Sequence, residues 1–361
     1  MKILGIESSC DETAVAIVED GHNVLKNMVS SQIAKHAEYG GVIPELAARE
    51  HLKSIKQITE QALKEAELTL DDIDAIAVTQ LPGLIPALLV GINYAKGLAA
   101  ASNKRLIPVN HITAHIFGAF IENKEMLKDP ETYPILALVV SGGHTNLVLI
   151  DETGKVTAVG HTLDDAAGEA FDKAAKILDL PYPGGPVIDR IAKTGNPEAI
   201  KFPRPLCPSP GNAVKPQNKF HFSFSGLKTA LLYQVKDPSK EKVFEQKVDI
   251  SDEEMADLLA SFQDAIVDTL VIKTRIAAEA YNAKTIVLCG GVACNSRLRT
   301  KMTDMVELEN YKLAIAPPKY CTDNAAMIAG MAYYQNDQSD DNFMGMDARA
   351  RLQGITQVSF T

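Results

Sequence analysis

The segment Lys2-Ile-Leu-Gly-Ile-Glu-Ser-Ser-Cys-Asp-Glu-Thr-Ala-Val-Ala-Ile-Val18 is the part of the sequence that best indicates the fold. Two apolar runs flank a polar turn, which predicts a β-hairpin with functional groups at its bend. The pattern recurs in Ile135-Leu-Ala-Leu-Val-Val-Ser-Gly-Gly-His-Thr-Asn-Leu-Val-Leu-Ile150, with Thr13 and Thr145 standing 132 residues apart. A repeat of this kind is expected when one lobe has been duplicated into two. The two hairpin turns would then face a single cleft.

Helices and strands alternate along the rest of the chain, which is typical of an α/β protein. We expect helices at residues 45–67, 84–102, 164–179, 224–235, 252–282 and 323–335, and further strands at 73–79, 105–109 and 285–289. These elements predict a first lobe at residues 1–130 and a second lobe at 131–335, with the last helix closing the cleft. Residues 336–361 are polar and predict an irregular, partly ordered tail.

The composition indicates a globular protein with ample core. The chain has 361 residues and is 46% hydrophobic, and its length is near that of two typical domains. We find no apolar run near the ~18 to 20 residues that a spanning helix needs and no signal pattern at the N-terminus, so we expect no membrane contact and a cytoplasmic location. The five cysteines are scattered without a CxxC pair, which predicts reduced, mostly buried thiols.

The net charge of −10 argues against binding nucleic acid through an overall positive field. One segment differs from this average. Residues 199–236 contain no Asp or Glu but six lysines and arginines, interleaved with four phenylalanines and one tyrosine. Such a mixture suits phosphates and exposed bases. A Pro-rich loop that covers the core is the other interpretation, and the sequence does not decide between the two.

The pair His111 and His115 is the strongest candidate for metal binding. Both follow a strand that ends at Val109, and Asn110 is placed to cap the helix that carries them. Positions i and i+4 share one helix face with Cβ atoms about 5 to 6 Å apart, so two imidazoles can converge on one divalent cation. Asp323 at the predicted start of the last helix would either supply a third, anionic ligand or merely cap that helix.

An HxxxH pair alone is only moderately specific, and an ordinary helix face is the competing interpretation. A zincin protease would have HExxH, in which the glutamate activates the attacking water. Ile112 occupies that position here, which weakens the peptidase interpretation.

Two glycine-rich turns are candidates for ligand binding. Ser141-Gly-Gly-His144 forms the second hairpin turn, where glycines let main-chain N–H groups approach an anion. Gly290-Gly-Val-Ala-Cys-Asn295 follows a buried strand and opens a helix, and Asn295 has the amide groups to read a base or ribose. Each turn alone is weak evidence, since a plain strand-to-helix connection also explains the second, but the two together are stronger.

Two further carboxylates lie near predicted helix ends. Asp172 and Asp189 are suited to ribose hydroxyls, although helix capping or ion pairing is the commoner role of such residues. The Walker sequence GxxxxGK[ST] is absent, so an ordinary P-loop is not expected.

The motifs, taken in chain order, resemble those of one family, the TsaD family, which was formerly called glycoprotease. The resemblance runs from about residue 2 to residue 351. It rests on Glu7-Ser-Ser-Cys-Asp-Glu-Thr13, Tyr39-Gly-Gly-Val-Ile-Pro-Glu45, Asn110-His-Ile-Thr-Ala-His115, Ser141-Gly-Gly-His-Thr145, Gly168-Glu-Ala-Phe-Asp-Lys173, Phe222-Ser-Phe-Ser-Gly-Leu-Lys228, Gly290-Gly-Val-Ala-Cys-Asn295 and Cys321-Thr-Asp-Asn324. A set of motifs this specific does not arise by accident.

The resemblance implies a two-lobed actin-like, sugar-kinase-like ATPase fold of duplicated ribonuclease-H-like lobes that no longer phosphorylates. It implies transfer of the threonylcarbamoyl group from threonylcarbamoyl-AMP to N6 of adenosine 37 in tRNAs that read codons beginning with A. By matching position, one iron or zinc ion would be held by His111, His115 and Asp323, and Asp11 would be the residue most tied to catalysis. The positions that would bind the adenylate are Val139, Val140, Ser141, Gly142, Gly143, Asp172, Gly185, Asp189 and Asn295.

The resemblance also implies partner proteins. Contacts to tRNA would be shared with a paralogue related to the first lobe (TsaB-like) and with a small P-loop ATPase (TsaE-like), which agrees with the acidic net charge. The stretch with Gly83, Gly91 and Gly97 offers small residues on which the paralogue could pack, but a tightly packed core helix explains these glycines better.

Two features depart from the family pattern. The segment Pro205 to His221 is longer and richer in proline, and Cys294 replaces the commoner alanine. Neither touches a proposed ligand.

Three alternative functions remain open at this stage. They are a metal-dependent glycoprotein endopeptidase, a kinase or ATPase of the actin and sugar-kinase class, and a non-catalytic scaffold. Retention of Asp11 together with the three metal-ligand candidates argues against the scaffold.

Overall fold

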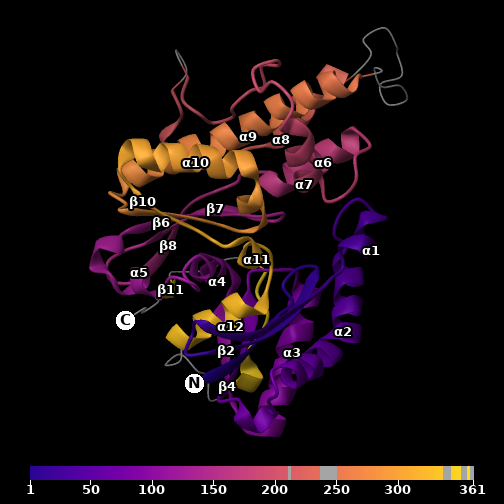
Figure 1. Cartoon of the computed structure of the whole chain (residues 1–361), viewed down its shortest axis with the longest axis vertical. Helices are drawn as coiled ribbons and strands as arrows, with labels where there is room; N and C mark the ends of the chain where they lie inside the picture. The colour runs from indigo at the N-terminus through magenta and orange to yellow at the C-terminus, as the bar shows by residue number, and fades with distance from the viewer. Residues whose placement is uncertain (210–212, 236–249, 336–342, 351–355, 358–361) are drawn as a thin grey trace.

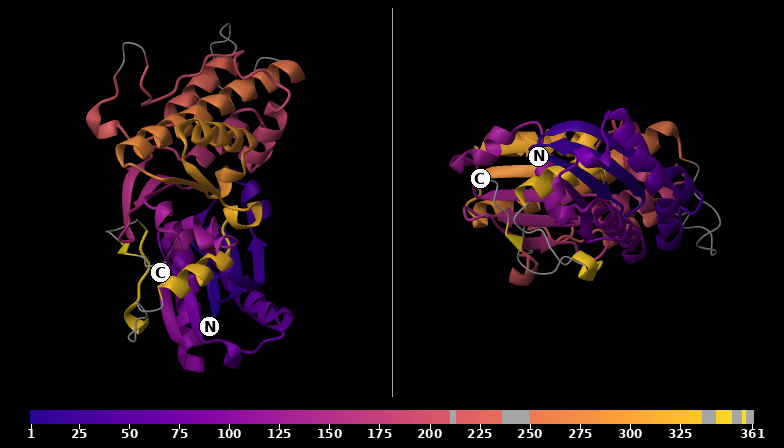
Figure 2. Two further views of the ribbon diagram at one scale, coloured as in Figure 1. Left: turned by 60° about the vertical axis from the view of Figure 1, so that its left-hand side comes forward. Right: turned by 90° about the horizontal axis from the view of Figure 1, so that it is seen from below.

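The computed structural model describes the whole chain except residues 210–212, 236–249, 336–342, 351–355 and 358–361. The described residues form two mixed β-sheets surrounded by helices, and the two sheets follow one another along the long axis of the molecule (Figure 1). Figure 2 shows the same arrangement from the side, with the N-terminal lobe at one end and the orange helices of the second lobe at the other.

Five strands of each sheet follow the same order. The first sheet runs β3-β2-β1-β4-β5, and the second, read from its other edge, runs β8-β7-β6-β9-β10, with the short strand β11 added beside β8. The strands are β1 (Lys2–Glu7), β2 (Glu12–Glu19), β3 (Asn23–Ser31), β4 (Ala75–Leu81), β5 (Arg105–Asn110), β6 (Ile135–Val140), β7 (Thr145–Ile150), β8 (Lys155–His161), β9 (Thr285–Cys289), β10 (Lys312–Ile315) and β11 (Thr356–Gln357). In each sheet the hairpin is antiparallel and its first strand pairs in parallel with the fourth. The predicted duplication is therefore confirmed.

The helices lie around and between the sheets. They are α1 (Ile33–Ala37), α2 (Pro44–Glu65), α3 (Ile85–Ser102), α4 (His111–Gly118), α5 (Lys124–Lys128), α6 (Ala167–Ile177), α7 (Gly184–Ala192), α8 (Ser225–Val235), α9 (Asp252–Ala280), α10 (Ser296–Glu309), α11 (Pro318–Cys321) and α12 (Ala325–Tyr334). Helices α6 to α10 gather on the outer side of the second sheet, whereas α4 and α11 lie toward the first lobe (Figure 1).

Alternate residues of the first hairpin face different helical layers, as the period-2 geometry of a strand requires. Leu4 and Val15 pack into a core with side chains of α2 and α3. Ile3 and Ala14 belong to the large core that includes α4, α12 and the second sheet. The first sheet is thus covered on both faces, which explains the continuous apolar runs in the sequence.

The sequence placed the last helix in the second lobe, but α12 lies against the first. It packs against β1, β2 and β4 of the first sheet and against α4. Gly5 permits this approach, because a Cβ atom there would lie 2.7 Å from the carbonyl oxygen of Ala325. The chain therefore returns to the first lobe after the second, and Asp323 lies at this crossing. The division at residues 130 and 335 otherwise stays a prediction.

The expectation that no apolar run approaches the length of a membrane span is wrong for helix α3. Its 18 residues, Ile85–Ser102, are long and apolar enough to cross a membrane by length and composition, and among the described residues it is the single helix of that kind. It packs against α2 and β4. Core helices pass the same test, so one such helix is weak evidence for a span.

The described parts of the tail contact both lobes. Met346 is buried against the core of α2 and α3, and Lys96 Nζ donates to its carbonyl oxygen over 2.6 Å. Thr356–Gln357 then pairs antiparallel with β8 of the second sheet. These contacts tie residues from the end of the chain to both halves of the molecule.

The basic segment at residues 199–236 lies mostly against the core of the second lobe. Phe202, Phe222 and Phe224 are buried in that core. Lys273 of α9, also fully buried, donates to the carbonyl oxygens of Asn218 and Lys219 over 3.0 Å each. The loop-over-core interpretation accounts for these three aromatic side chains, while Lys236 and residues 210–212 lie outside the described part of the chain.

Candidate metal centre and interlobe cleft

The two candidate histidines come together because β5 runs directly into α4. Asn110 caps this helix as predicted, with its Oδ1 accepting from the main-chain N–H of Ile112 over 2.9 Å and of Thr113 over 3.4 Å. His111 and His115 consequently project from one face, with ring centroids 4.5 Å apart. Both side chains are buried.

Asp323 reaches the same point from the connection between α11 and α12. Its Oδ1 lies 3.1 Å from His115 Nε2 and 3.6 Å from His111 Nε2. One ligand atom from each of the three residues lies within 4.8 Å of the others. Two imidazole nitrogens and one carboxylate oxygen that converge from two elements are a donor set suited to iron or zinc. The structure therefore brings together the three residues named from the sequence, and their binding of a metal stays a prediction.

Glu7 also belongs to this site, although no sequence pattern singled it out. His111 Nδ1 lies 3.0 Å from Glu7 Oε2, which also accepts from the Thr79 hydroxyl over 2.7 Å. A carboxylate that holds one imidazole nitrogen fixes the tautomer and aims the other nitrogen at a metal. His115 has no such support, because its buried Nδ1 has no hydrogen-bond partner among the described residues.

The charges at this site shift one another's pKa values. Burial favours the neutral imidazole of His111, but the carboxylates of Asp323 and Glu7 outweigh it and raise the pKa of His111 to about 9. Burial would raise the pKa of Asp323, yet the positive charge of His111 and contacts with His115 hold it well below its usual range. Without a cation the pair binds a proton, and a metal ion would replace that proton.

Asp11 lies in the turn between β1 and β2, and it is buried. Its carboxylate is close enough to Asp172 and Tyr182 of the second lobe to raise the pKa of each, after the larger effect of burial. Burial and then the charge of Asp11 also raise the pKa of Glu12 to about 10. The turn that carries Asp11 thus faces Asp172 and Tyr182 of the second lobe.

The second hairpin turn faces this cleft from the other side. The ring of His144 lies 5.8 Å from that of His111, centroid to centroid. Gly142 and Gly143 have open space where a Cβ atom would stand. Gly168 of α6 approaches the turn so closely that a Cβ atom there would lie 2.7 Å from Gly142 Cα. The turn therefore has a packed back and an open front, which is the form of a main-chain anion cradle.

The remaining residues predicted to bind the adenylate differ in burial and in hydrogen bonding. Val139 and Val140 are fully buried, so only their main-chain groups are available to a ligand. Asp172 Oδ1 accepts from Gly184 N over 2.7 Å, and Asp189 Oδ1 accepts from the Ser296 hydroxyl over 2.8 Å. Gly185, like Gly142 and Gly143, borders open space.

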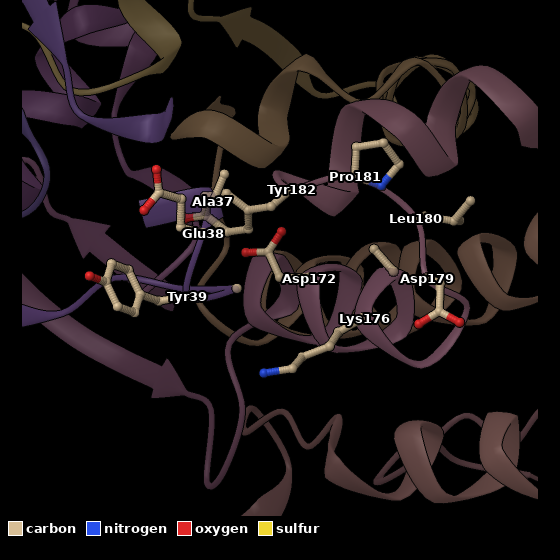
Figure 3. A pocket seen from close by; sticks show the side chains of 11 residues that line it. Ala37, Glu38, Tyr39, Asp172, Lys176, Asp179, Leu180, Pro181 and Tyr182 are labelled. Carbon is tan, nitrogen blue, oxygen red and sulfur yellow. The ribbon is translucent and has the colours of Figure 1, made fainter. Parts of the chain in front are cut away.

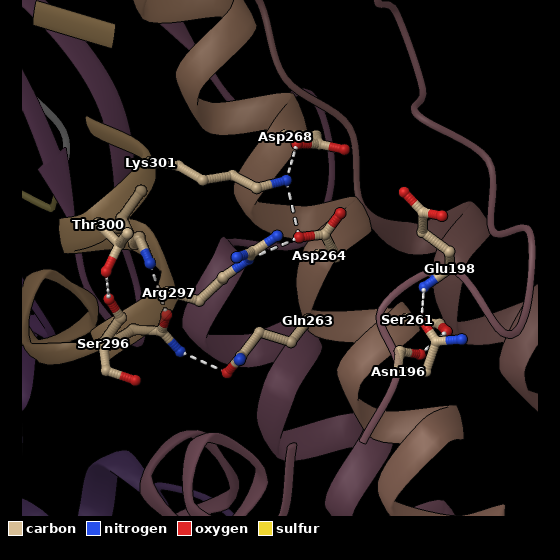
Figure 4. A network of polar contacts seen from close by, with 12 residues as sticks. Asn196, Glu198, Ser261, Gln263, Asp264, Asp268, Ser296, Arg297, Thr300 and Lys301 are labelled. Atoms are coloured by element: carbon tan, nitrogen blue, oxygen red, sulfur yellow. Dashed lines mark hydrogen bonds and ion pairs between the residues drawn. The ribbon is translucent and has the colours of Figure 1, made fainter. Parts of the chain in front are cut away.

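Asn295 is held at the start of α10 by hydrogen bonds. Its Oδ1 accepts from Leu298 N over 2.9 Å, and its Nδ2 donates to Gln263 Oε1 of α9 over 2.7 Å. Figure 4 shows Gln263 beside the ion pairs that join α9 and α10. The next residue of α9, Asp264, binds Arg297 and Lys301 of α10 over 2.8 and 2.7 Å. Helix α9 thus fixes the turn that precedes α10, and among the described residues the second amide hydrogen and second oxygen lone pair of Asn295 have no partner.

A cavity of about 570 Å³ opens beside Asp172. Residues 37–40 of the first lobe form one wall, and α6 with residues 179–182 of the second lobe forms the other. Figure 3 shows the side chain of Asp172 between Tyr182 and Lys176, with Glu38 and Tyr39 across from them. The two lobes therefore leave room for a ligand beside Asp172 and Tyr182, whereas Asp11 and the three metal-ligand candidates do not line this cavity.

A model of the family described as TsaD, tRNA N6-adenosine threonylcarbamoyltransferase, matches residues 23–330. This match covers most of the chain. The chain belongs to the TsaD family.

Curated TsaD relatives agree over nearly the whole length. The tRNA N6-adenosine threonylcarbamoyltransferase of Geotalea uraniireducens is 50% identical over 93% of this chain and 92% of its own length. The proteins of the same name from Geobacter sulfurreducens and Fusobacterium nucleatum are 49% and 47% identical and cover 97% and 99% of this chain, and 96% and 98% of their own lengths.

Solved structures of other proteins share the TsaD fold at low sequence identity. Full-length HypF is 14% identical, with a TM-score of 0.57 over 93% of this chain and 46% of its own. Component A of the Acidaminococcus fermentans (R)-2-hydroxyglutaryl-CoA dehydratase is 15% identical, with a TM-score of 0.50 over 93% and 99% of the two chains. These likenesses confirm the two-lobed actin-like ATPase fold predicted from the sequence.

Proposed function

We propose that this chain transfers the threonylcarbamoyl group of threonylcarbamoyl-AMP to N6 of adenosine 37 in tRNAs that read codons beginning with A. The observation that carries the proposal is the meeting of His111, His115 and Asp323 beside an open glycine turn, in a chain of the TsaD family. The name of the family and of its relatives supports this reaction, and the candidate residues are of the kinds that it would use.

The second lobe would bind the adenylate. Main-chain N–H groups of Gly142 and Gly143 would bind the phosphate, because no described atom lies within 4 Å of where a Cβ atom of either glycine would stand. The N–H of Ser141 is bonded to the carbonyl oxygen of His144, so Ser141 would offer its hydroxyl instead. Asp172 and Asp189 would hold ribose hydroxyls. Gly185 leaves room for the nucleoside, and the free lone pair and N–H of Asn295 would read it, while Val139 and Val140 contribute main chain alone.

One divalent ion, iron or zinc, would be held by Nε2 of His111, Nε2 of His115 and a carboxylate oxygen of Asp323. When bound, it would supply positive charge beside the phosphate and threonyl oxygens of the donor. Glu7 supports this set by holding Nδ1 of His111, which leaves Nε2 free for the ion.

The acceptor amine is a weak nucleophile because its lone pair is delocalised into the adenine ring, so positioning against an activated donor matters most. The N6 nitrogen bonds to the carbonyl carbon of the threonylcarbamoyl group, the bond from that carbon to the phosphate oxygen breaks, and AMP leaves with the electron pair. Asp11, in the buried turn that faces the cleft, would accept the proton that N6 loses.

The partners would be tRNA and two proteins, a TsaB-like paralogue and a TsaE-like P-loop ATPase, all in the cytoplasm. An apolar groove of about 460 Å³ between α2 and α3 supports the first protein contact. Leu52 and Leu89 line it and are 66% and 37% exposed. Gly91 is not available for such a contact, because it packs against Ser8 inside the core.

The alternative activities are not favoured. In a peptidase of the zincin type, position 112 would carry the base, but Ile112 is buried and apolar. Glu7 cannot replace it, since its carboxylate is bonded to His111 Nδ1 and Thr79 rather than aimed at a metal-bound water. No observation on the described residues favours a kinase.

The test combines the purified chain with unmodified tRNA, synthetic threonylcarbamoyl-AMP and the two candidate partners, followed by mass spectrometry of the nucleosides. We expect threonylcarbamoyladenosine from the wild type and none from His111→Ala. His161→Ala, which removes an exposed histidine outside the cleft, serves as the matched control and should keep full activity. Absence of product from the wild type with donor, metal and partners present would refute the proposal.

A further inference from the structure

A buried histidine supports the turn that carries Asp11. His51 of α2 is fully buried. Its Nε2 lies 3.0 Å from the carbonyl oxygen of Cys10, and its Nδ1 lies 2.8 Å from the hydroxyl of Thr13. One imidazole ring thereby bridges the residues on the two sides of Asp11 and Glu12.

The hydrogen bonds around His51 define a single protonation state. A carbonyl oxygen can only accept, so Nε2 carries a proton. The side-chain amide nitrogen of Gln32, which can only donate, lies 3.4 Å from Nδ1, so Nδ1 accepts and Thr13 donates its hydroxyl hydrogen to it. Burial lowers the pKa of His51, which agrees with a neutral ring. Every polar group of the bridge therefore has a partner of the right kind.

A second chain of contacts ties the same turn to the wall of the cavity. The main-chain N–H of Gln32 donates to the carbonyl oxygen of Asp11 over 3.2 Å. The side-chain oxygen of Gln32 accepts from His36 Nε2 over 3.1 Å, and His36 Nδ1 accepts from Ile43 N over 3.3 Å. Between His36 and Ile43 lie residues 37–40, which line the cavity. The first lobe thus holds Asp11 and the cavity wall in one buried polar network.

We propose that His51 is a positioning residue that fixes Asp11 for the transfer reaction. The inference rests on the proposed function, in which Asp11 accepts the proton of the acceptor amine. The turn at residues 8–11 has no regular secondary structure, so its shape depends on such bonds. A misplacement of about 1 Å in a reacting group can lower the rate by about 100-fold. His51 itself touches neither substrate nor reacting atoms.

The first experiment compares His51→Leu with His51→Gln in the full chain, assayed with threonylcarbamoyl-AMP, unmodified tRNA and the partner proteins. His51→Leu removes both bonds, and we expect kcat to fall by about 10- to 100-fold while the KM for the donor and the bound metal stay unchanged. The amide nitrogen of a glutamine can replace Nε2 as donor to Cys10, so His51→Gln should recover most of kcat. Equal kcat for the wild type and a folded His51→Leu would overturn the inference.

The second experiment is a double-mutant cycle with Asp11→Asn. If His51 acts through Asp11, adding His51→Leu to Asp11→Asn should cause no further loss, whereas two independent roles would multiply. Thr13→Val keeps the shape of the side chain and breaks the other end of the bridge, so it repeats the test should His51→Leu fail to fold. A multiplicative cycle, or Thr13→Val with unchanged kcat, contradicts the inference. A wild type without product would instead mean that the proposed function fails.

Discussion

The two hairpin turns occupy equivalent places in two sheets of the same strand order, yet their surroundings are opposite. The first turn is buried: Ser8, Ser9 and Asp11 are 0%, 2% and 7% exposed. The second turn, residues 141–144, leaves Gly142 and Gly143 facing open space. The two lobes therefore share a backbone arrangement but differ at the turn: the first presents buried side chains, and the second leaves main-chain groups exposed.

The contacts of each turn explain this difference. Ser8 donates its hydroxyl to the carbonyl oxygen of Ala87 on α3 over 3.0 Å, and Ser9 accepts from Leu84 N over 2.9 Å. The turn of the second lobe bonds mainly to itself, through Ser141 N and the carbonyl oxygen of His144 over 2.8 Å, and to Gly168 at its back. A ligand can therefore approach the second turn without breaking a bond.

Removal of one candidate ligand is the strongest test of the proposal that His111, His115 and Asp323 bind a metal. In Asp323→Ala the two histidines lose the anionic oxygen that completes their set, so metal affinity should fall by more than about 100-fold and product formation should cease. Metal content after dialysis, measured by elemental analysis, checks this. Asp304→Ala, at an exposed position of α10, is the matched control and should retain the metal. Full metal retention by Asp323→Ala would show that the ion binds elsewhere.

The support of His111 by Glu7 gives the next largest effect. Glu7→Gln keeps the shape of the side chain but removes the charge that orients Nδ1, so we expect metal affinity to fall by about 10- to 100-fold. Competition with a chelator of known affinity measures it. Glu19→Gln at the far end of the same hairpin should leave the affinity unchanged, and an unchanged affinity in Glu7→Gln would assign Glu7 to folding alone.

The sequence was sufficient for the parts of this site that are local. The spacing of His111 and His115 and the cap at Asn110 follow from helix geometry, and both proved correct. Glu7 could not be found in this way, because it is 104 positions from His111 and its contact depends on how β1 and β5 lie in the sheet. Buried polar residues at strand ends are the signal that a sequence offers for such a partner, and that signal is weak.

For the fold too, the sequence predicted local pairings but not contacts between distant segments. Repeated hairpins predicted both sheets because strand pairing within a hairpin is local. Helix α12 was assigned to the wrong neighbour, since its residues are apolar on every side and give no direction for packing. The aromatic side chains Phe202, Phe222 and Phe224 were open to two interpretations because composition does not report burial.

Alanine substitutions at Gly142 and Gly143 test whether the open main chain of the second turn binds the phosphate of the adenylate. Gly142→Ala and Gly143→Ala place a methyl group in open space, so stability should change by less than about 0.5 kcal/mol. The KM for the adenylate should rise by about tenfold if the phosphate approaches there. Gly168→Ala is the contrasting variant: its Cβ atom would lie 2.7 Å from Gly142 Cα, and we expect about 1 to 3 kcal/mol of destabilisation. Unchanged KM in both front variants would exclude the cradle.

The smallest expected effect concerns the pH dependence of stability at Asp172. Burial raises the pKa of this carboxyl from 3.8 to about 6, against a hydrogen bond from Gly184 that lowers it. A raised pKa means that the folded state binds the proton more tightly than the unfolded state, so this group lowers stability progressively as pH rises from about 4 to about 6, and the loss persists above that range. Asp172→Asn stays neutral and still accepts from Gly184, so it should be more stable than the wild type by about 1 kcal/mol at pH 7.5, after allowance for partial exposure, and equally stable near pH 4.

Urea unfolding of both proteins at pH 4 and pH 7.5 measures this difference. Asp151 in the turn between β7 and β8 provides a control of opposite sign, because hydrogen bonds from Thr153 lower its pKa. Its stabilisation is present above its unfolded pKa and is lost as pH falls, so Asp151→Asn should be the less stable variant at pH 7.5. If Asp172→Asn instead lost stability at pH 7.5, the ionised carboxylate would be favoured by the fold. Asp172 would then be a carboxylate stabilised by the second lobe, as Asp11 is proposed to be held by the first.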